Sequence, residues 1–397
     1  MLEWLIVGGG PQGVIFARAL QRYTCLDPSS LVIVDRNRTL LSEWQRNTQR
    51  CGMHYLRSPG AHSLEPDFGN LFQFARTRGF DPATHLMGRY QRPSLELFAE
   101  HSREVIRRGE LEGRLRSATV DALSRERDSW TATTSDGTSY EARSVLLATG
   151  PGRPEPAPQW CFNLRRDVWG HVFDSAWELP AGAPANRVAV IGGGATGAQL
   201  AVRCARLGSD VVLVVENPPI VEQFDSDPCF IGRRCGADYE RASRDERRRM
   251  VTAARRPGTI PPDVALTLDR AVKRGDLRLV VGHIVAAMTE HGAVSLELAS
   301  GEVLSVDRVA LATGFHWDVE EARSLVSDPL PVDPGGLPMI SPWLEWAEHL
   351  FVTGRLAEGE IGPPAPNLIG AHNAAKRVIA WMKGEAATPV RGWSHYR

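Results

Sequence analysis

The nine residues LIVGGGPQG, at 5–13, decide which fold the sequence predicts. They join a predicted strand to a predicted helix, and Asp35 ends the next predicted strand. In this pattern Gly8 permits a tight turn, Gly10 lets the backbone approach a pyrophosphate, and Gly13 lets the helix pack closely on the strand. Free N–H groups at the helix N-terminus bind phosphate, and Asp35 would accept hydrogen bonds from ribose hydroxyls. The stretch therefore predicts a dinucleotide-binding turn.

A second stretch, AVIGGGATG at 189–197, repeats the pattern. Its glycines are Gly192, Gly194 and Gly197, and Glu216 follows the next predicted strand. Two complete patterns predict two bound dinucleotides, and the usual pairing is a tightly held FAD with an exchangeable nicotinamide nucleotide. A carboxylate at Glu216 would accept a hydrogen bond from the ribose 2′-OH and repel a 2′-phosphate, which favours NADH over NADPH.

An arginine-rich stretch, 240–256, predicts one helix beyond this second site and leaves the choice of nucleotide open. Arg234 and the cluster at 247–249 could fold back and bind a 2′-phosphate. The alternative is a solvent-exposed helix face on which the cluster pairs with Asp245 and Glu246. The cofactors predicted are therefore FAD with either NADPH or NADH.

Two further stretches, VLLATG at 145–150 and VALATG at 309–314, interleave with the two glycine patterns. This order predicts an α/β fold with two Rossmann-like domains, each a three-layer ββα arrangement. Proline-rich residues 151–158 predict an extended crossover. The NAD(P)H domain, 160–307, would be inserted in a discontinuous FAD domain, 1–155 and 308–397. The ATG stretches add three predicted cofactor-binding residues: Gly150, Thr313 and Gly314.

The composition limits the classes of partner. The chain has 397 residues, 43% of them hydrophobic, and a formal net charge of −1. It has enough apolar residues for two or three domain cores and lacks the basic field that nucleic acid or an anionic membrane requires. No apolar run reaches the roughly 18 residues of a membrane span, and the N-terminus has no basic signal region. We expect a soluble cytoplasmic protein that binds neither nucleic acid nor membrane.

The six cysteines include no C-x-x-C pair and have no His partners at zinc-ligand spacing. We therefore expect a reducing compartment, no disulfide framework and no metal site. Disulfide reductases built on two such domains carry paired cysteines beside the flavin. Here Cys229 and Cys235 stand in a different arrangement, and Cys51 is alone in the segment after the first pattern. We interpret Cys51 as an ordinary semi-buried residue, the alternative being a thiol that cycles through sulfenic acid.

The interleaved motifs resemble those of flavoproteins with two dinucleotide-binding domains. Within these, the chain resembles the single-component flavin-dependent monooxygenases, in particular the branch of lysine and ornithine N-hydroxylases. DRVALATGF at 307–315 is similar to the branch motif D-x3-[LF]-ATG-Y, with Phe315 in place of Tyr and Glu320 where the motif has His or Pro. GHVFDSAW at 170–177 is similar to the linker signature of flavin monooxygenases, with Asp174 at the position of its His.

Two longer stretches carry the rest of the resemblance. WQRNTQRCGMHYLRSP at 44–59 resembles the loop that these enzymes place over the flavin, and residues 351–377 resemble their second flavin-binding segment. In the second segment a helix N-terminus would stabilise the negative charge of a reduced flavin. The cofactor contacts implied are Trp44, Gly354, Leu368 and Ile369. Candidates for catalytic residues are His54 and Arg57 in the loop and His316 where the chain crosses back, although a lone His more often has a structural role.

The resemblance implies that NAD(P)H reduces FAD, which then activates O₂ to oxygenate a small nucleophilic substrate, an amine nitrogen above all. Asp174 and Glu320 favour an alternative, a flavoprotein reductase whose acceptor is a quinone, a disulfide or an electron-transfer protein. A third reading, a non-catalytic dinucleotide sensor, is disfavoured because all six pattern glycines are present. The sequence leaves open the identity of the substrate and whether the chain forms a homo-oligomer.

Overall fold

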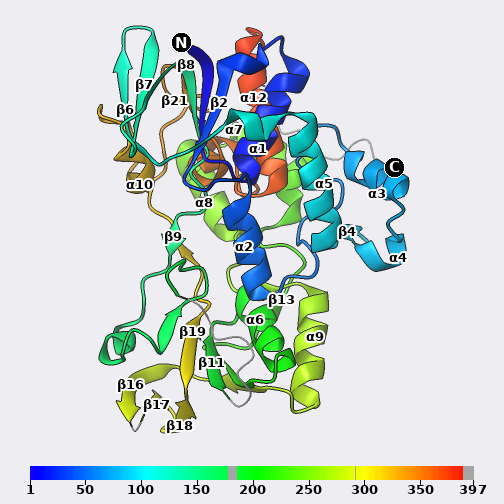
Figure 1. Cartoon of the computed structure of the whole chain (residues 1–397), viewed down its shortest axis with the longest axis vertical. Coiled ribbons are helices and arrows are strands. Elements are labelled where there is room, and N and C mark those ends of the chain that lie inside the picture. Colours follow the sequence, from blue (N-terminus) through cyan, green and yellow to red (C-terminus); the bar gives the residue numbers. More distant parts are fainter. Residues whose placement is uncertain (178–185, 291, 388–397) are drawn as a thin grey trace.

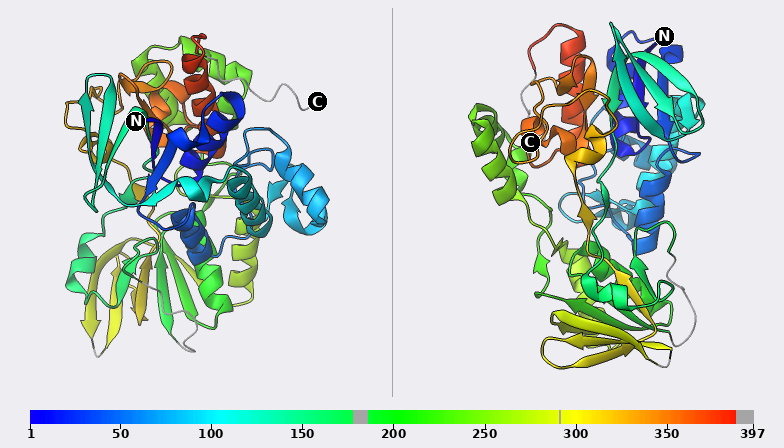
Figure 2. Two further views of the ribbon diagram at one scale, coloured as in Figure 1. Left: turned by 45° about the horizontal axis from the view of Figure 1, so that its top comes forward. Right: turned by 90° about the vertical axis from the view of Figure 1, so that its left-hand side faces the viewer.

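The chain folds into two lobes, each built on a β-sheet whose central strands are parallel (Figures 1 and 2). The computed structural model describes residues 1–177, 186–290 and 292–387. In this part of the chain no helix is long and apolar enough to cross a membrane.

The first lobe is built on a sheet in the order β21-β22-β8-β1-β2-β5, and β6 and β7 extend it beyond β8. Alternate residues of β1 face opposite layers, as a strand requires. Trp4 and Ile6 pack with the helices, whereas Leu5 and Val7 pack with β6 and β7. The lobe is therefore a sheet between helices and a β-meander. Its main elements are β1 (Leu2–Val7), α1 (Pro11–Tyr23), β2 (Leu31–Asp35), α5 (Leu95–Arg108), β5 (Leu115–Ser117), β6 (Val120–Glu126), β7 (Ser129–Thr134), β8 (Ser139–Leu147), β21 (Glu345–Ala347), β22 (Leu350–Val352) and α12 (Leu368–Met382).

The second lobe repeats this arrangement on an all-parallel sheet in the order β10-β19-β11-β12-β15. Helices cover one face of the sheet and a three-stranded meander covers the other. Its elements are β10 (Trp169–His171), β11 (Arg187–Ile191), α6 (Ala195–Arg206), β12 (Asp210–Val215), α9 (Pro262–Lys273), β15 (Arg278–Val281), β16 (Ile284–Glu290), β17 (Ala293–Leu298), β18 (Val303–Val306) and β19 (Arg308–Leu311). Because β19 lies in this sheet, the predicted domain boundary at 307 falls too early.

Two crossing strands connect the lobes. β9 (Arg153–Pro154) pairs antiparallel with β20 (Phe315–His316), so the outgoing and returning chain lie side by side. Gly152 has a φ of +93°, and a Cβ there would lie 2.3 Å from the carbonyl oxygen of His316. The crossover predicted from the prolines at 151–158 thus includes a position that only glycine fits.

Residues 217–258, which we call the arm, leave the second lobe and pack on the first (Figure 1). The arm contains β13 (Ile220–Val221), η4 (Pro228–Ile231), α7 (Arg233–Arg241) and α8 (Arg244–Ala254), and β14 (Thr259–Ile260) follows it. The single helix predicted over 240–256 is wrong because Ser243 caps a new helix. Its hydroxyl accepts from the Glu246 N–H, and the Glu246 carboxylate accepts from the Ser243 N–H. This reciprocal capping box starts α8 and separates it from α7.

The remaining elements lie in the first lobe and the connecting segments. They are η1 (Pro28–Ser30), α2 (Ser42–Cys51), α3 (Asn70–Arg78), α4 (Pro82–His85), β3 (Leu86–Met87), β4 (Arg92–Pro93), η2 (Leu111–Arg114), η3 (Gln159–Asn163), α10 (Val319–Arg323), η5 (Gly354–Ala357) and α11 (Glu358–Ile361).

Candidate functional site

The first glycine turn, between β1 and α1, fits a bound pyrophosphate. A Cβ at Gly8 would lie 2.2 Å from the carbonyl oxygen of Ala148, and one at Gly13 would lie 2.0 Å from that of Gly8. Both glycines are therefore required by packing. A Cβ at Gly10 would have no atom within 4 Å, so the backbone is open to a ligand there. Helix α1 begins directly after Gly10 and leaves its first N–H groups free for phosphate oxygens.

The second turn, between β11 and α6, has the same geometry. A Cβ at Gly192 would lie 2.4 Å from the carbonyl oxygen of Ala312, and one at Gly197 would lie 2.0 Å from that of Gly192. Gly194 is again open, with only the Cα of Gly258 nearby at 3.7 Å. The ATG stretches are thus part of the turns, because the alanine carbonyl that follows the adjacent strand fills the space beside the first glycine.

The two turns differ in the residue that faces them from the next strand. The Gly8 N–H donates to Val34 in the first turn, and the Gly192 N–H donates to Val214 in the second. Val215 therefore occupies in the second turn the position that Asp35 occupies in the first. Glu216 lies one residue further along the chain. The Asp35 carboxylate accepts a hydrogen bond of 2.7 Å from the Gly9 N–H.

The structure does not direct Glu216 at the second turn, so its contact with the ribose stays a prediction that this geometry disfavours. Its side chain is 72% exposed and lies 3.1 Å from Nδ1 of His283. Because successive residues of a strand point to opposite faces, a shift of one residue turns the carboxylate away from the glycine turn. Val215, which is buried, packs against Gly193 instead.

The predicted arginine cluster does not face the second turn. Arg247 forms an ion pair of 2.8 Å with Glu360 in the first lobe, and Arg248 pairs with Asp245 on its own helix. Arg234 is exposed in the first turn of α7. These contacts place the cluster partly on the lobe interface and partly in solvent.

Gln12 joins the first turn to the C-terminal segment. Its side-chain oxygen accepts from the Thr353 hydroxyl at 2.7 Å, and its Nε2 donates to the Pro366 carbonyl at 3.2 Å. Gly354 beside it adopts a φ of +65°. The loop before α12 is tight, because a Cβ at Gly370 would lie 2.2 Å from the Pro364 carbonyl oxygen. Sequence reasoning missed Gln12, which occupies a position of the pattern that any residue can fill.

The N-terminus of α12 points its free N–H groups out of this loop. No side chain caps the helix, and Leu368 and Ile369 form its first turn. Asn367, the N-cap residue, instead donates to the Asp225 carboxylate of the arm at 3.3 Å. The predicted pair Leu368 and Ile369 therefore lies where the C-terminal segment, the first turn and the arm meet.

Several buried polar atoms on α2, in the arm and in the C-terminal segment lack a partner among the described residues. They include Nε of Arg46, Oδ1 of Asn47, Nε2 of Gln223, Nε of Arg355 and Nδ2 of Asn373. Buried polar groups are costly to leave unpaired, so such a set indicates a polar ligand. Together with the open glycines it fits a dinucleotide. Trp44, on the same helix as Asn47, packs on Phe98 with 5.2 Å between ring centroids.

The three predicted catalytic residues do not converge. Arg57 donates four hydrogen bonds, to the carbonyls of Glu222, Gln223 and Thr259 and to the Thr259 hydroxyl, at 2.8–3.3 Å. Burial lowers its pKa, yet its donors are mostly occupied by the junction between the lobes. His54 is exposed and lies 2.9 Å from Arg206, and His316 lies 4.0 Å from Glu155 on the crossover. Their catalytic roles stay predictions.

The cysteines differ from the prediction at one point. Cys229 and Cys235 form a disulfide, a pairing that the expectation of no disulfide framework did not include. Spacing alone could not show this, because pairing depends on how η4 meets α7 in space. Cys51 is buried, and burial raises its pKa to about 11. Its thiol stays protonated at neutral pH, which disfavours the sulfenic acid cycle.

Comparison with known proteins gives two kinds of match. Residues 6–228 match the family described as pyridine nucleotide-disulphide oxidoreductase. A glutathione reductase from Burkholderia cepacia is 31% identical over 179 residues, which cover 45% of this chain and 30% of the relative. The match thus spans under a third of that curated relative's length.

Among solved structures, an ornithine N-hydroxylase from Kutzneria sp. 744 superposes with a TM-score of 0.75 and 17% identity, over 97% of this chain and 99% of that one. A cadaverine monooxygenase from Erwinia amylovora, solved with FAD, gives 0.74 and 14% over 100% and 98%. At such identities the likeness establishes the fold, two dinucleotide-binding domains over the whole chain.

Proposed function

Because this chain belongs to the pyridine nucleotide-disulphide oxidoreductase family, we propose that it is an FAD-dependent NAD(P)H oxidoreductase that oxygenates a small amine. The observation that carries the proposal is the pair of intact glycine turns, each closed by packing and open at its middle glycine. The likeness of fold to the ornithine N-hydroxylase and the cadaverine monooxygenase supports oxygenation of an amine nitrogen.

Each of the two glycine turns would bind one of the two cofactors. In this proposal Gly10 and the α1 N-terminus hold the FAD pyrophosphate, and Gly194 with the α6 N-terminus holds that of NAD(P)H. FAD, when bound, would supply hydride acceptance and reaction with O₂. Gln12 fixes the α12 N-terminus against the first turn, where the helix dipole would stabilise negative charge. Arg57 holds the first lobe to the arm through hydrogen bonds to the carbonyls of Glu222 and Gln223.

The choice of nucleotide follows from the second turn. Val215 offers no carboxylate to bind a 2′-OH or to repel a 2′-phosphate, and Glu216 is directed away from the turn. The site would therefore accept NADPH as well as NADH.

The second candidate is a flavoprotein disulfide reductase. The match to a glutathione reductase favours it. It uses the same two turns and differs in the electron acceptor, so the fold alone fits both candidates.

Stopped-flow spectroscopy tests the proposal. The FAD-loaded protein is reduced anaerobically with NADPH or NADH and mixed with O₂, with and without aliphatic diamines or basic amino acids. We expect a transient absorbing species, unlike oxidised or reduced flavin, and an amine-dependent hydroxylamine product. Direct reoxidation of the flavin with hydrogen peroxide as the sole product would contradict oxygenation. Rapid turnover with a disulfide acceptor would then favour the reductase.

A further inference from the structure

The arm is held against the first lobe by a buried aromatic residue. Tyr239 of α7 is 2% exposed, and its hydroxyl donates to the carbonyls of Glu358 at 2.7 Å and Gly359 at 3.2 Å. Its ring lies 3.4 Å from the position that a Cβ at Gly362 would take. Gly362 begins the loop that leads into α12, so α7 packs directly on the segment that forms the α12 N-terminus.

A buried ionic cluster adds to this contact. Arg247 of the arm pairs with Glu360 at 2.8 Å, and Arg255 pairs with Glu358. Arg377 of α12 lies 3.6 Å from both Glu240 of the arm and Glu360. Separating such buried partners leaves charges without compensation, which is strongly unfavourable. The arm therefore stays docked only while α7 and α8 keep the orientation that places these side chains.

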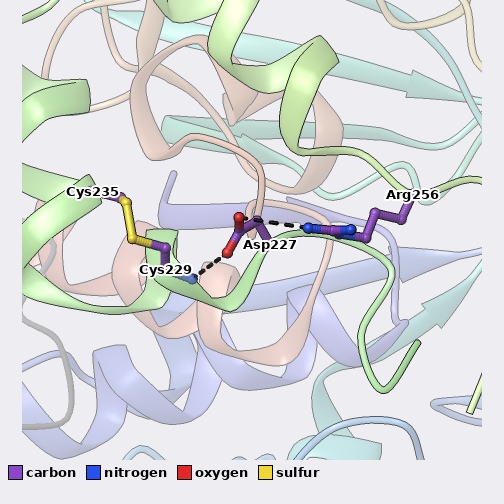
Figure 3. Close-up of a disulfide and its surroundings, with 4 residues drawn as sticks. All are labelled: Asp227, Cys229, Cys235 and Arg256. Carbon is purple, nitrogen blue, oxygen red and sulfur yellow. Dashed lines mark hydrogen bonds and ion pairs between the residues drawn. A yellow bond between two sulfur atoms is a disulfide. The ribbon is translucent and has the colours of Figure 1, made fainter.

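The Cys229–Cys235 disulfide joins η4 to the start of α7 (Figure 3). Cys229 belongs to η4 and Cys235 is the third residue of α7, one helical turn before Tyr239. The Asp227 carboxylate accepts from the Cys229 N–H at 2.9 Å and lies 3.7 Å from Arg256. Phe230, inside the loop that the disulfide closes, meets the Tyr239 ring edge-on at 6.2 Å. The covalent bond thus ties η4 to the first turn of α7, one helical turn before Tyr239.

The surroundings of the two sulfur atoms permit exchange with thiols in solution. Cys229 and Cys235 are each partly exposed, whereas Cys51, Cys161 and Cys204 are buried. After reduction Cys235 would lie in the first turn of a nine-residue helix, where the helix dipole stabilises a thiolate. A partly exposed cysteine whose sulfur leaves as a stabilised thiolate is typical of disulfides that exchange readily.

We propose that Cys229–Cys235 is a reversible thiol–disulfide exchange site whose reduction loosens the arm from the first lobe. The reductant is a thiol or dithiol in solution. Its thiolate attacks one sulfur and displaces the other as a thiolate, and a second thiolate resolves the mixed disulfide. The pair gains two electrons and two protons, and the reductant is oxidised to its disulfide. The inference does not depend on the proposed oxygenation, because neither flavin nor nicotinamide takes part.

Native alkylation with mass spectrometry tests the chemistry. In the oxidised protein we expect one labelled cysteine, the exposed Cys25, and after incubation with excess reduced glutathione or dithiothreitol we expect three. Removal of the reductant and addition of oxidised glutathione should restore one. The Cys25→Ser variant is the matched control, in which the count should change from none to two. A pair that stays oxidised in excess reductant, or that fails to re-form, overturns the proposal.

Hydrogen exchange tests the consequence for the arm. Opening the short loop between the cysteines returns conformational freedom to the chain, so amide exchange in α7 and α8 should rise by about tenfold or more on reduction. Exchange in α5, which lies outside the arm, should not change. The double variant Cys229→Ser with Cys235→Ser should match the reduced protein, and the reduced wild type keeps the test valid if that variant fails to fold. Unchanged exchange in α7 and α8 after full reduction overturns the proposal.

Discussion

The two glycine turns share one backbone design and differ at one side chain. Gly8 and Gly192 face an alanine carbonyl, Gly13 and Gly197 face the carbonyl of the first glycine, and the middle glycines are open in both. In the first turn Asp35 bonds back to the Gly9 N–H, whereas the second turn has the apolar Val215 at that position. The shared backbone design suits a dinucleotide, and we expect this single strand position to adjust which nucleotide binds and how tightly.

We expect the largest effect from adding a side chain at the glycines that have no room for a Cβ. A Cβ at Gly13 or Gly197 would lie 2.0 Å from a carbonyl oxygen, so each alanine variant must displace backbone. We expect Gly13→Ala to abolish FAD binding, and Gly197→Ala to give a protein that keeps FAD but loses reduction by NAD(P)H. The overpacking would cost about 1–3 kcal/mol of folding free energy. Flavin content and anaerobic reduction rates measure the two outcomes.

Alanine at the open glycines is the matched control for that experiment. Gly10→Ala and Gly194→Ala meet no close protein atom and should leave the unfolding temperature nearly unchanged. They should weaken only the binding of the nucleotide that approaches the turn. Loss of both cofactors in Gly197→Ala would show that the two turns do not act as separate sites.

The two lobes should also differ in acid stability. Of the buried histidines in the described chain, His62, His101 and His372 lie in the first lobe and His171 in the second. Burial lowers the pKa of His62 to about 3 and those of the other three to about 4, below the unfolded value of 6.5. The unfolded chain therefore takes up protons first, and stability falls as pH drops below about 6.5.

We expect the first lobe to lose more stability than the second between pH 7 and pH 5. Each buried histidine contributes on the order of 1–2 kcal/mol to this loss. Hydrogen exchange of core amides in β1 and β11 at the two pH values measures it lobe by lobe. His101→Gln should reduce the loss in the first lobe, and the exposed His54→Gln should not. Equal losses in both lobes would contradict this account.

Nucleotide preference is the most direct test of the difference between the turns. Val215→Asp places a carboxylate where Asp35 stands in the first turn, so it should bind a ribose 2′-OH and repel a 2′-phosphate. We expect the ratio of kcat/KM for NADH over NADPH to rise about ten- to hundredfold, which corresponds to about 1.4–2.7 kcal/mol. The matched control Glu216→Gln should change the ratio less than about threefold, because that side chain is exposed. A large effect of Glu216→Gln would reverse the assignment.

The sequence predicted those parts of the site that depend on local backbone requirements. The glycines, the strands and helices on either side of them and the alanine stretches could be read because each must recur at a fixed spacing. The position of Glu216 could not, because a register shift of one residue is invisible until the strand is paired with its neighbour. Gln12 and Tyr239 act through partners more than a hundred residues away along the chain, to which no spacing points.

Removing the negative charge of Asp35 in the first turn should have the smallest effect. Asp35→Asn keeps an oxygen that can accept from the Gly9 N–H, so the turn itself should persist. The variant loses the charge that strengthens a hydrogen bond from a ribose hydroxyl, which is worth about 1 kcal/mol. We expect FAD affinity to fall about fivefold, measured by flavin fluorescence on dilution, with no change in NAD(P)H affinity. Asp35→Val, which gives the first turn the residue type of the second, should weaken FAD binding further. If it did not, the carboxylate would have no part in retaining FAD, and the difference between the turns would concern the nicotinamide nucleotide alone.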